Sequence, residues 1–273
     1  MSAAQRWAAA LDAWAIPREL LDAADDSPYG WPQSMWRRRT EMARQEAETP
    51  TTVIVRGLAG PDGAIIDVGA GRGRASLPLA AEGHPLTAVE PDAAMAAGLG
   101  EDAADAGIAV TVVQGRWPES ASEVGPAAVV MSANVVYDVT RIVPFLQAMH
   151  DGATTGVVIE LTATHPWSSL APYYLALHGL ERPNGPTIAD LVEVVTEVIG
   201  VEPQVERWSR AGQMWFADWD EITEYYGRRL VLPRPRRAEL RPLLGPEVTE
   251  HDGHLFIGDG ARDLATVSWT SSS

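Results

Sequence analysis

The feature that most constrains this chain is a short apolar segment, residues 64–68, that runs into three glycines. The segment reads Ala-Ile-Ile-Asp-Val, and Gly69, Gly71 and Gly73 follow it at alternate positions before a helix-like stretch begins. Glycine lets the backbone come close to a ligand, and a helix N-terminus offers free N–H groups. A buried strand that passes through such a turn into a helix is typical of ligand sites in α/β proteins. The segment therefore predicts a ligand site at this turn.

From residue 64 onwards, strand-like and helix-like segments alternate. The expected strands cover 64–68, 86–90, 109–113, 127–131 and 156–161, and the expected helices between them cover 74–82, 92–106 and 139–150. Near-continuous apolar strands in such an alternation predict a parallel sheet with helices on both faces. We predict an α/β fold with a Rossmann-like, doubly wound, mostly parallel seven-stranded sheet, an antiparallel edge and an N-terminal helical lid.

The flanking segments are expected to add helices and a final hairpin. A helical pair interrupted at Pro17, a helix from Pro32 to Glu48 and a short helix over residues 51–58 make residues 1–60 an N-terminal helical cap, and residues 61–273 form the sheet domain with helical insertions near 165–200 and 215–245. The last two strand-like runs, near 254–258 and 263–269, have no long crossover between them. They predict an antiparallel hairpin at the edge of the sheet.

Composition excludes several classes of function. Apolar residues make up 46% of the 273 residues, and the formal net charge of −16 opposes binding to nucleic acid or to an anionic membrane. The chain has no cysteine, which excludes disulfides, thiol catalysis and cysteine-ligated metals. No apolar run approaches the roughly 18 residues of a membrane helix. We expect a cytoplasmic protein without a metal, and an oligomer is possible.

Two classes of cofactor site begin with a glycine-rich first turn. The dinucleotide fingerprint G-x-G-x-x-G needs a third glycine where this chain has Arg74. The spacing found here has an acid, Asp67, two residues before Gly69, and a second acid, Glu90, at the end of the next strand. An acid at that second position can accept hydrogen bonds from both hydroxyls of a ribose. Over residues 60–165 the chain resembles the class I S-adenosylmethionine-dependent methyltransferases, and its further pattern resembles an actinobacterial type of that class.

The resemblance implies a set of cofactor-binding residues. These are Asp67, Gly69, Ala70, Gly71, Glu90, Pro91, Gln114, Gly115, Arg116, Trp117 and Ser132. In the family, the glycine turn meets the methionine part of S-adenosyl-L-methionine, the first acid orients the turn and the ammonium group, and the second acid holds the ribose. Family members often present an acid to the adenine amino group after the third strand. This chain has Gln114-Gly-Arg-Trp there instead, so the adenine contact is left open.

Each of these residues also has a structural alternative. Asp67 could cap the glycine turn, Glu90 could be a solvated acid at a strand end, and Trp117 could belong to ordinary packing. These alternatives stay open at the level of sequence.

The catalytic candidates follow the fourth and fifth strands. In methyltransferases the segment after the fourth strand lies beside the donated methyl group, which makes Asn134 and Tyr137 candidates for contact with the acceptor. The Asn/Asp-Pro-Pro-Tyr/Phe motif of amino-group methyltransferases is absent, since Val135 and Val136 stand in place of the prolines. His165 leaves the fifth strand on the ligand side and is the candidate general base.

The expected partner is a small methyl acceptor, possibly aromatic or hydrophobic, modified at an O or N atom. Aromatic residues of the lid regions support this expectation, and their alternative role is packing of the lid: Tyr29, Trp31, Trp36, Trp167, Tyr173 and Tyr174. The alternative functions are a non-catalytic S-adenosylmethionine-binding module, an RNA or protein methyltransferase that uses basic residues such as Arg37–Arg39, and an NAD(P)-dependent oxidoreductase.

Overall fold

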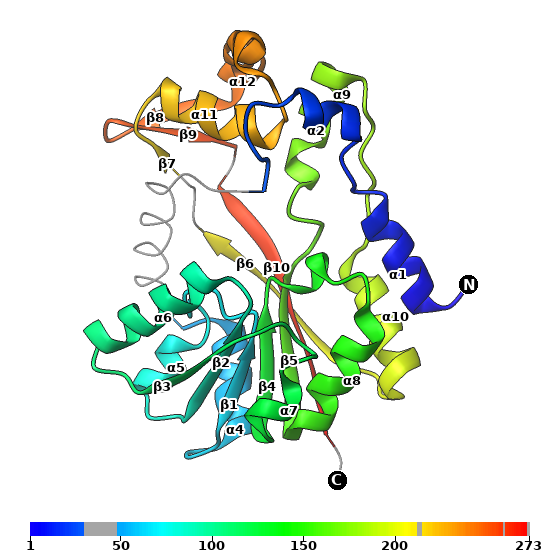
Figure 1. Ribbon diagram of the computed structural model, residues 1–273, viewed down its shortest axis with the longest axis vertical. Coiled ribbons are helices and arrows are strands. Elements are labelled where there is room, and N and C mark those ends of the chain that lie inside the picture. The colour runs from blue at the N-terminus through cyan, green and yellow to red at the C-terminus, as the bar shows by residue number, and fades with distance from the viewer. Residues whose placement is uncertain (30–47, 212–214, 259, 272–273) are drawn as a thin grey trace.

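The computed structural model describes residues 1–29, 48–211, 215–258 and 260–271. Its centre is a seven-stranded sheet with the strand order β3-β2-β1-β4-β5-β10-β6 (Figure 1). The strands are β1 (Ile65–Val68), β2 (Leu86–Glu90), β3 (Val110–Gln114), β4 (Ala127–Ala133), β5 (Ala153–Thr162), β6 (Gln204–Ala211) and β10 (Ala261–Thr270). The first five pair in parallel, and β10 pairs antiparallel with both β5 and β6. The predicted Rossmann-like α/β fold, with a mostly parallel seven-stranded sheet and an antiparallel edge, is confirmed, whereas the N-terminal helical lid stays a prediction.

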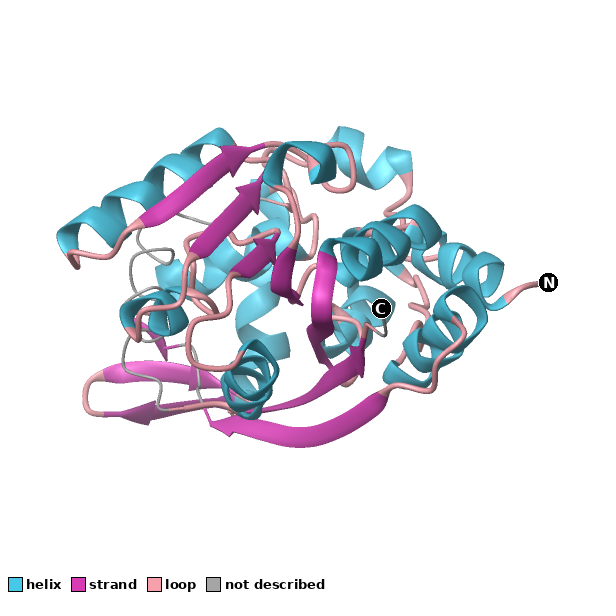
Figure 2. Cartoon of the chain, turned by 90° about the horizontal axis from the view of Figure 1, so that it is seen from below, coloured by secondary structure: helices cyan, strands magenta, loops and turns pink. Residues whose placement is uncertain are grey.

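Helices cover both faces of the sheet, as Figure 2 shows. Alternate residues of a strand point to opposite faces, so Ile66 of β1 packs in one apolar cluster and its neighbour Ile65 in another. The first cluster includes α1 (Ala3–Asp12), α8 (Ile142–Gly152) and α10 (Ile188–Ile199), and the second includes α4 (Pro50–Ala59) and α5 (Leu77–Ala81). The outer strands β2 and β3 pack against α6 (Ala93–Asp105). Burial on both faces explains why the central strands are almost uniformly apolar.

The N-terminal helices begin where capping residues allow. Ser2 caps α1 in a capping box with Gln5, α2 (Arg18–Ala23) starts directly after Pro17, and Thr49 caps α4 with Pro50 in its first turn. The helical pair around Pro17 and the short helix over 51–58 are thus confirmed. Most of the helix expected from Pro32 to Glu48 lies outside the described residues. The division of the chain at residue 60 stays a prediction.

A third apolar cluster lies beside the end of the sheet from which β10 and β6 extend, at the top of Figure 1. It holds a separate three-stranded sheet with the order β7-β9-β8. Its elements are β7 (Trp215–Phe216), β8 (Val248–His251), β9 (His254–Ile257), α2, α9 (Ala171–His178), α11 (Trp219–Arg229) and α12 (Leu240–Leu244). The remaining short helices are α7 (Ala121–Val124), η1 (Val136–Asp138), η2 (Ser168–Leu170), η3 (Arg234–Glu239) and η4 (Gly245–Glu247).

The hairpin expected from the last two strands is wrong. β9 pairs with β7 and β8 in the small sheet, whereas β10 lies inside the main sheet between β5 and β6. The reason is burial: residues 264–269 of β10 are all buried, which requires strands on both sides, while every residue of β9 is only half-buried. Among the described helices, none is long and apolar enough to cross a membrane.

Candidate functional site

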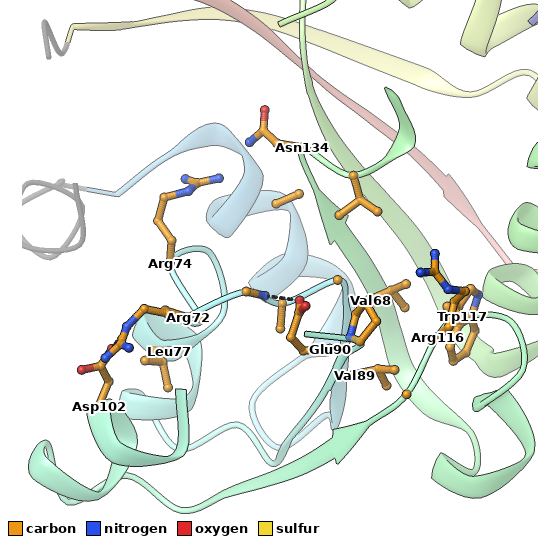
Figure 3. Close-up of a pocket in the computed structure, with 18 of the residues that line it drawn as sticks. Val68, Arg72, Arg74, Leu77, Val89, Glu90, Asp102, Arg116, Trp117 and Asn134 are labelled. Atoms are coloured by element: carbon orange, nitrogen blue, oxygen red, sulfur yellow. Dashed lines mark hydrogen bonds and ion pairs between the residues drawn. The ribbon is translucent and has the colours of Figure 1, made fainter. Parts of the chain in front are cut away.

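A cavity of about 780 Å³ opens at the C-terminal ends of the parallel strands (Figure 3). Four loops line it, residues 68–74 after β1, 89–91 after β2, 115–117 after β3 and 133–135 after β4. Ligands of open α/β sheets bind in this crevice, where the strand order changes direction on either side of the first strand. The structure thus places the glycine turn in the wall of a cavity large enough for a nucleoside-sized ligand.

The three glycines of the turn have different structural reasons. All three have a positive φ, which favours glycine. A Cβ on Gly69 would lie 2.5 Å from the side chain of Val135, and a Cβ on Gly73 would lie 2.6 Å from Leu77, so these two positions are fixed by close packing. A Cβ on Gly71 would meet no atom within 4 Å. Because Gly71 also lines the cavity, it leaves open space where a ligand can approach the backbone.

Glu90 joins the ends of β1 and β2. Its carboxylate is buried at the cavity wall and accepts the backbone N–H of Gly71 on one oxygen and the N–H of Asp92 on the other, both at 2.8 Å. Asp92 in turn caps α6. An ionised carboxylate oxygen accepts more than one hydrogen bond, so both oxygens keep acceptor capacity. The structure therefore makes Glu90 a buried, positioned acid rather than a solvated strand end.

Asp67 is a buried acid with an unused acceptor. Its side chain is 1% exposed, and Oδ1 has no hydrogen-bond partner among the described residues. Burial raises the pKa of Asp67 to about 6, although the nearby Ser76 hydroxyl and Arg74 cation act in the opposite direction. No backbone N–H of the glycine turn donates to it within the described ranges. A buried acceptor two residues before Gly69 suits a ligand that brings a donor or a positive charge.

Only part of the segment at the end of β3 lines the cavity. Gln114 is exposed and does not line the cavity, whereas Gly115, Arg116 and Trp117 do. The Gly115 N–H donates to the main-chain oxygen of Glu90 at 3.1 Å, and a Cβ here would lie 1.9 Å from the Ser120 hydroxyl. The Trp117 indole is 7% exposed and its N–H donates to the carbonyl of Phe145 at 3.2 Å, so this ring both packs and forms cavity wall.

Of Ser132 and Asn134, at the end of β4, only Asn134 lines the cavity. Ser132 is fully buried and donates to the carbonyl of Val68 at 2.9 Å, so it joins β4 to β1 and does not line the cavity. Asn134 does line it, with a φ of 61° that asparagine tolerates better than most residues. Its backbone N–H donates to the Glu160 carbonyl at 2.8 Å, and its side-chain Nδ2 donates to the Glu160 carboxylate at 2.9 Å. Ala70 and Pro91 line the cavity as well.

Glu160 on β5 is the centre of a network that sequence reasoning did not assemble. Its carboxylate is 1% exposed and accepts bonds from Arg74 at 2.5 Å and from the Thr51 hydroxyl at 2.8 Å, with Arg210 at 3.7 Å. Burial alone raises the pKa of Glu160, but the two arginines and the hydrogen bonds outweigh it, so this pKa lies below its usual range. The sequence signals were an acid, Glu160, at the end of the fifth apolar run, which could be a buried acid facing the crevice or merely a sheet-end residue, and Arg74 in the place of a third glycine.

Tyr137 and His165 lie away from the cavity wall. The Tyr137 hydroxyl donates to the carbonyl of Thr162 at 2.7 Å. The His165 ring stacks on Trp14 with ring centroids 4.0 Å apart, and its Nδ1 accepts the Trp167 backbone N–H at 3.2 Å. Burial and the nearby Arg182 lower the pKa of His165 to about 4. Of the three catalytic candidates, only Asn134 lines the cavity together with the predicted cofactor-binding residues. The role of His165 as a general base stays a prediction.

The lid aromatics are engaged with one another. Tyr29 stacks on Trp167 at 5.6 Å between centroids, the Tyr173 hydroxyl donates to Glu247, and the Tyr174 hydroxyl donates to the Arg229 carbonyl. None of these four aromatics lines the cavity, and Trp31 and Trp36 fall outside the described residues. Within the part of the chain that the structure describes, no group of His, Asp and Glu side chains is arranged to hold a metal ion.

The fold and the cavity define a class of protein. The seven-stranded sheet with an antiparallel β10 beside β5, and a glycine turn and acid at the ends of β1 and β2, is the Rossmann-like fold of the class I S-adenosylmethionine-dependent methyltransferases. Residues 65–156 match the family described as "Methyltransferase domain". This match begins at β1 and extends into β5, so it contains all four loops of the cavity. The chain thus carries a methyltransferase domain.

Several solved structures are similar to this chain at low sequence identity. A putative methyltransferase from Bacillus halodurans C-125 is 11% identical with a TM-score of 0.55, covering 83% of this chain and 100% of that one. A putative sarcosine dimethylglycine methyltransferase from Galdieria sulphuraria is 14% identical with a TM-score of 0.49, covering 93% and 96%. Magnesium protoporphyrin IX methyltransferase from Synechocystis, with bound S-adenosylhomocysteine, is 12% identical with a TM-score of 0.49, covering 88% and 90%. Comparison of the sequence with curated proteins yields no match.

Proposed function

We propose that this chain is an S-adenosylmethionine-dependent methyltransferase that modifies an O or N atom of a small molecule, and that it does so in the cytoplasm. The observation that carries the proposal is the bond from the Gly71 N–H to Glu90 at the cavity wall. It holds an open stretch of backbone and a buried carboxylate at fixed positions on either side of one binding space.

The residues of the cavity suit each part of the methyl donor. The unused acceptor of Asp67 suits the donor's ammonium group, and the open backbone at Gly71 suits close approach of its methionine chain. The remaining acceptor capacity of Glu90 suits the two hydroxyls of a ribose. When bound, S-adenosylmethionine supplies an activated methyl group on a sulfonium, so the protein contributes mainly alignment of the two reactants.

Asn134 supports an acceptor that carries an N–H or O–H group. The low pKa of Glu160 keeps its carboxylate ionised, and an ionised carboxylate only accepts hydrogen bonds. The amide nitrogen of Asn134 must therefore face Glu160, which turns its Oδ1 away from that carboxylate. A carbonyl oxygen on the cavity side can accept a hydrogen bond from the N–H or O–H group of an acceptor molecule. This bond would orient the lone pair of the acceptor's nitrogen or oxygen atom.

The alternatives differ in what they require. A dinucleotide site needs a third glycine for close helix–strand packing, whereas Arg74 stands there and its guanidinium bonds to Glu160. An RNA acceptor would have to overcome a net charge of −16. A non-catalytic binding module would bind the cofactor equally well, so only turnover separates it from an enzyme.

Transfer of a labelled methyl group tests the proposal. The full chain is incubated with S-adenosylmethionine labelled in its methyl group and with pools of small amines, phenols and carboxylic acids. We expect label in one or more small products, and loss of that label in Glu90→Ala. Binding of S-adenosylhomocysteine without transfer to any pool would favour the non-catalytic module, and transfer only to RNA or protein would contradict the small-molecule acceptor.

A further inference from the structure

Two charged side chains of the cavity differ from all the others. Four charged residues of the wall are engaged: Arg72 pairs with Asp102 at 2.8 Å, Arg74 pairs with Glu160, and Glu90 accepts two backbone N–H groups. Arg116, after β3, and Asp138, at the end of η1, also line the cavity. Both side chains are exposed, and neither makes a hydrogen bond or ion pair with another residue in the described ranges, although their charges are opposite.

These two side chains lie toward the β3 and β4 end of the cavity. In Figure 3, Arg116 and Trp117 stand on the opposite side of Glu90 from Arg72 and Asp102. The apolar wall at this end comes from Trp117, Val139 and Phe145, and the bond from the Trp117 indole to the Phe145 carbonyl fixes the large ring. An apolar wall with one free acceptor and one free donor suits a flat heterocycle with a polar edge.

Adenine has such an edge. Its exocyclic amino group donates hydrogen bonds, and the neighbouring ring nitrogens accept them. If Glu90 holds the ribose, as the proposed function requires, the base lies beyond the ribose, next to the β3 and β4 loops. Gln114, at the position where the family often places its adenine acid, does not line the cavity.

We propose that Asp138, from the loop after β4, accepts the adenine amino group and supplies the acid that is missing after β3. Arg116 on the facing loop offers N–H donors to the ring nitrogens beside that amino group. Desolvation at the cavity wall raises the pKa of the Asp138 carboxyl above its ordinary value. A ligand amino group would supply the missing hydrogen bond. This inference rests on the proposed function.

The test compares two nucleosides that differ at the polar edge of the base. S-inosylhomocysteine carries a keto oxygen in place of the adenine amino group of S-adenosylhomocysteine, and its neighbouring N1 carries a proton. Calorimetry with the full chain gives the ratio of the two dissociation constants, and we expect about tenfold or more in favour of the adenosyl compound. Asp138→Ala should lower the ratio. Asp138→Asn, whose amide can donate to the keto oxygen, should lower it or invert it.

The control separates reading of the base from general damage. Asp151→Ala removes an exposed aspartate that does not line the cavity, and it should leave the ratio as in the wild type. Far-ultraviolet circular dichroism confirms that each variant folds. A preference that is as large in both Asp138 variants as in the wild type would overturn the inference and leave the proposed function intact. A wild-type chain that binds neither nucleoside would overturn both.

Discussion

The carboxylate of Glu90 accepts the backbone N–H of Gly71 at 2.8 Å, which links the end of β2 to the turn after β1. The same carboxylate accepts the N–H of Asp92 at the start of α6. One acid therefore fixes two loops of the cavity, and any ligand bound to that acid also contacts a preformed wall. Removing this carboxylate should therefore weaken ligand binding in two ways, by the loss of bonds to the ligand and by the loss of support for the loops.

Glu90→Ala should weaken binding of S-adenosylhomocysteine by about 30- to 100-fold. The expected loss is about 2–3 kcal/mol, since charge-assisted hydrogen bonds to the ribose are removed and the turn loses its anchor. Isothermal calorimetry measures the change. Glu101→Ala, an exposed acid on α6, is the matched control and should bind as the wild type does. Equal affinities in the two variants would rule out the role given to Glu90.

Gly71→Ala should reduce cofactor binding with little steric effect on the protein itself. Its Cβ meets no protein atom within 4 Å, so the methyl group projects into free space at the cavity wall, and Gly71→Val should block the site more completely. Gly200→Ala carries the same backbone strain, because Gly200 has a φ of 80° and open space around it at the end of α10. Both alanine variants should lose about 1 kcal/mol of stability. Only Gly71→Ala should lose affinity in calorimetry; a similar loss in Gly200→Ala would contradict the assignment.

Asp67 predicts opposite effects of pH on stability and on binding. Its folded-state pKa of about 6 lies above the ordinary value of 3.8, so its contribution to stability is fully present below pH 4 and is lost as the pH rises through 6. Asp67→Asn should therefore be more stable than the wild type above pH 6, by up to roughly 3 kcal/mol. Thermal unfolding at pH 5 and pH 8 measures this difference.

Binding should show the reverse trend. A ligand ammonium beside Asp67 needs the ionised carboxylate, so the affinity of the wild type for S-adenosylhomocysteine should rise between pH 5 and pH 7 and then level off. Asp67→Asn should bind more weakly, without this rise. A rise of the same size in the variant would assign the titration to another group.

The pair of Arg74 with the buried Glu160 should matter more than exposed ion pairs. Arg74→Met leaves a buried carboxylate with one close cation fewer, and we expect a loss of about 3 kcal/mol in free energy of unfolding. Arg56→Met breaks the 2.8 Å pair with Glu82 and the pair with Glu48, in which all side chains are more than a third exposed, and should cost less than about 1 kcal/mol. Urea unfolding of the two variants makes the comparison, and equal losses would mean that Glu160 is satisfied without Arg74.

His165 is expected to influence stability rather than cofactor affinity. Its pKa is lowered to about 4, so its stabilising contribution is present above pH 6.5 and falls as the pH drops towards 4. His165→Phe keeps a ring against Trp14 and removes this titration. The melting temperature of the variant should therefore fall less than that of the wild type between pH 7 and pH 4.5. A variant that keeps its fold and binds S-adenosylhomocysteine but loses methyl transfer would instead support His165 as the base.

The parts of the site that the sequence could predict are local ones. Asp67, Gly71 and Glu90 lie within or at the end of two neighbouring strands, and the spacing of such residues survives in the one-dimensional pattern. The bond from Thr51 to Glu160 joins residues 109 positions apart, and no spacing in the sequence indicates it. A second limit is that the sequence does not show in which direction a polar side chain points. Ser132, at the end of β4, donates to the neighbouring strand β1 and not toward the cavity.

The fold, too, was predictable where it depends on local sequence and not where it depends on distant residues. Parallel strands joined by helices were predictable, since each apolar run is followed by its own crossover. The placement of β10 was not, because chain proximity favours a hairpin with β9 whereas burial of residues 264–269 requires both β5 and β6.

Calorimetric titration of the full chain with S-adenosylhomocysteine, and in parallel with NAD⁺ and NADH, tests the central claim most directly. We predict saturable binding of one S-adenosylhomocysteine per chain, weakened in Gly71→Ala and Glu90→Ala, with no heat of binding from either dinucleotide. Binding of NAD⁺ or NADH without binding of S-adenosylhomocysteine would contradict the account.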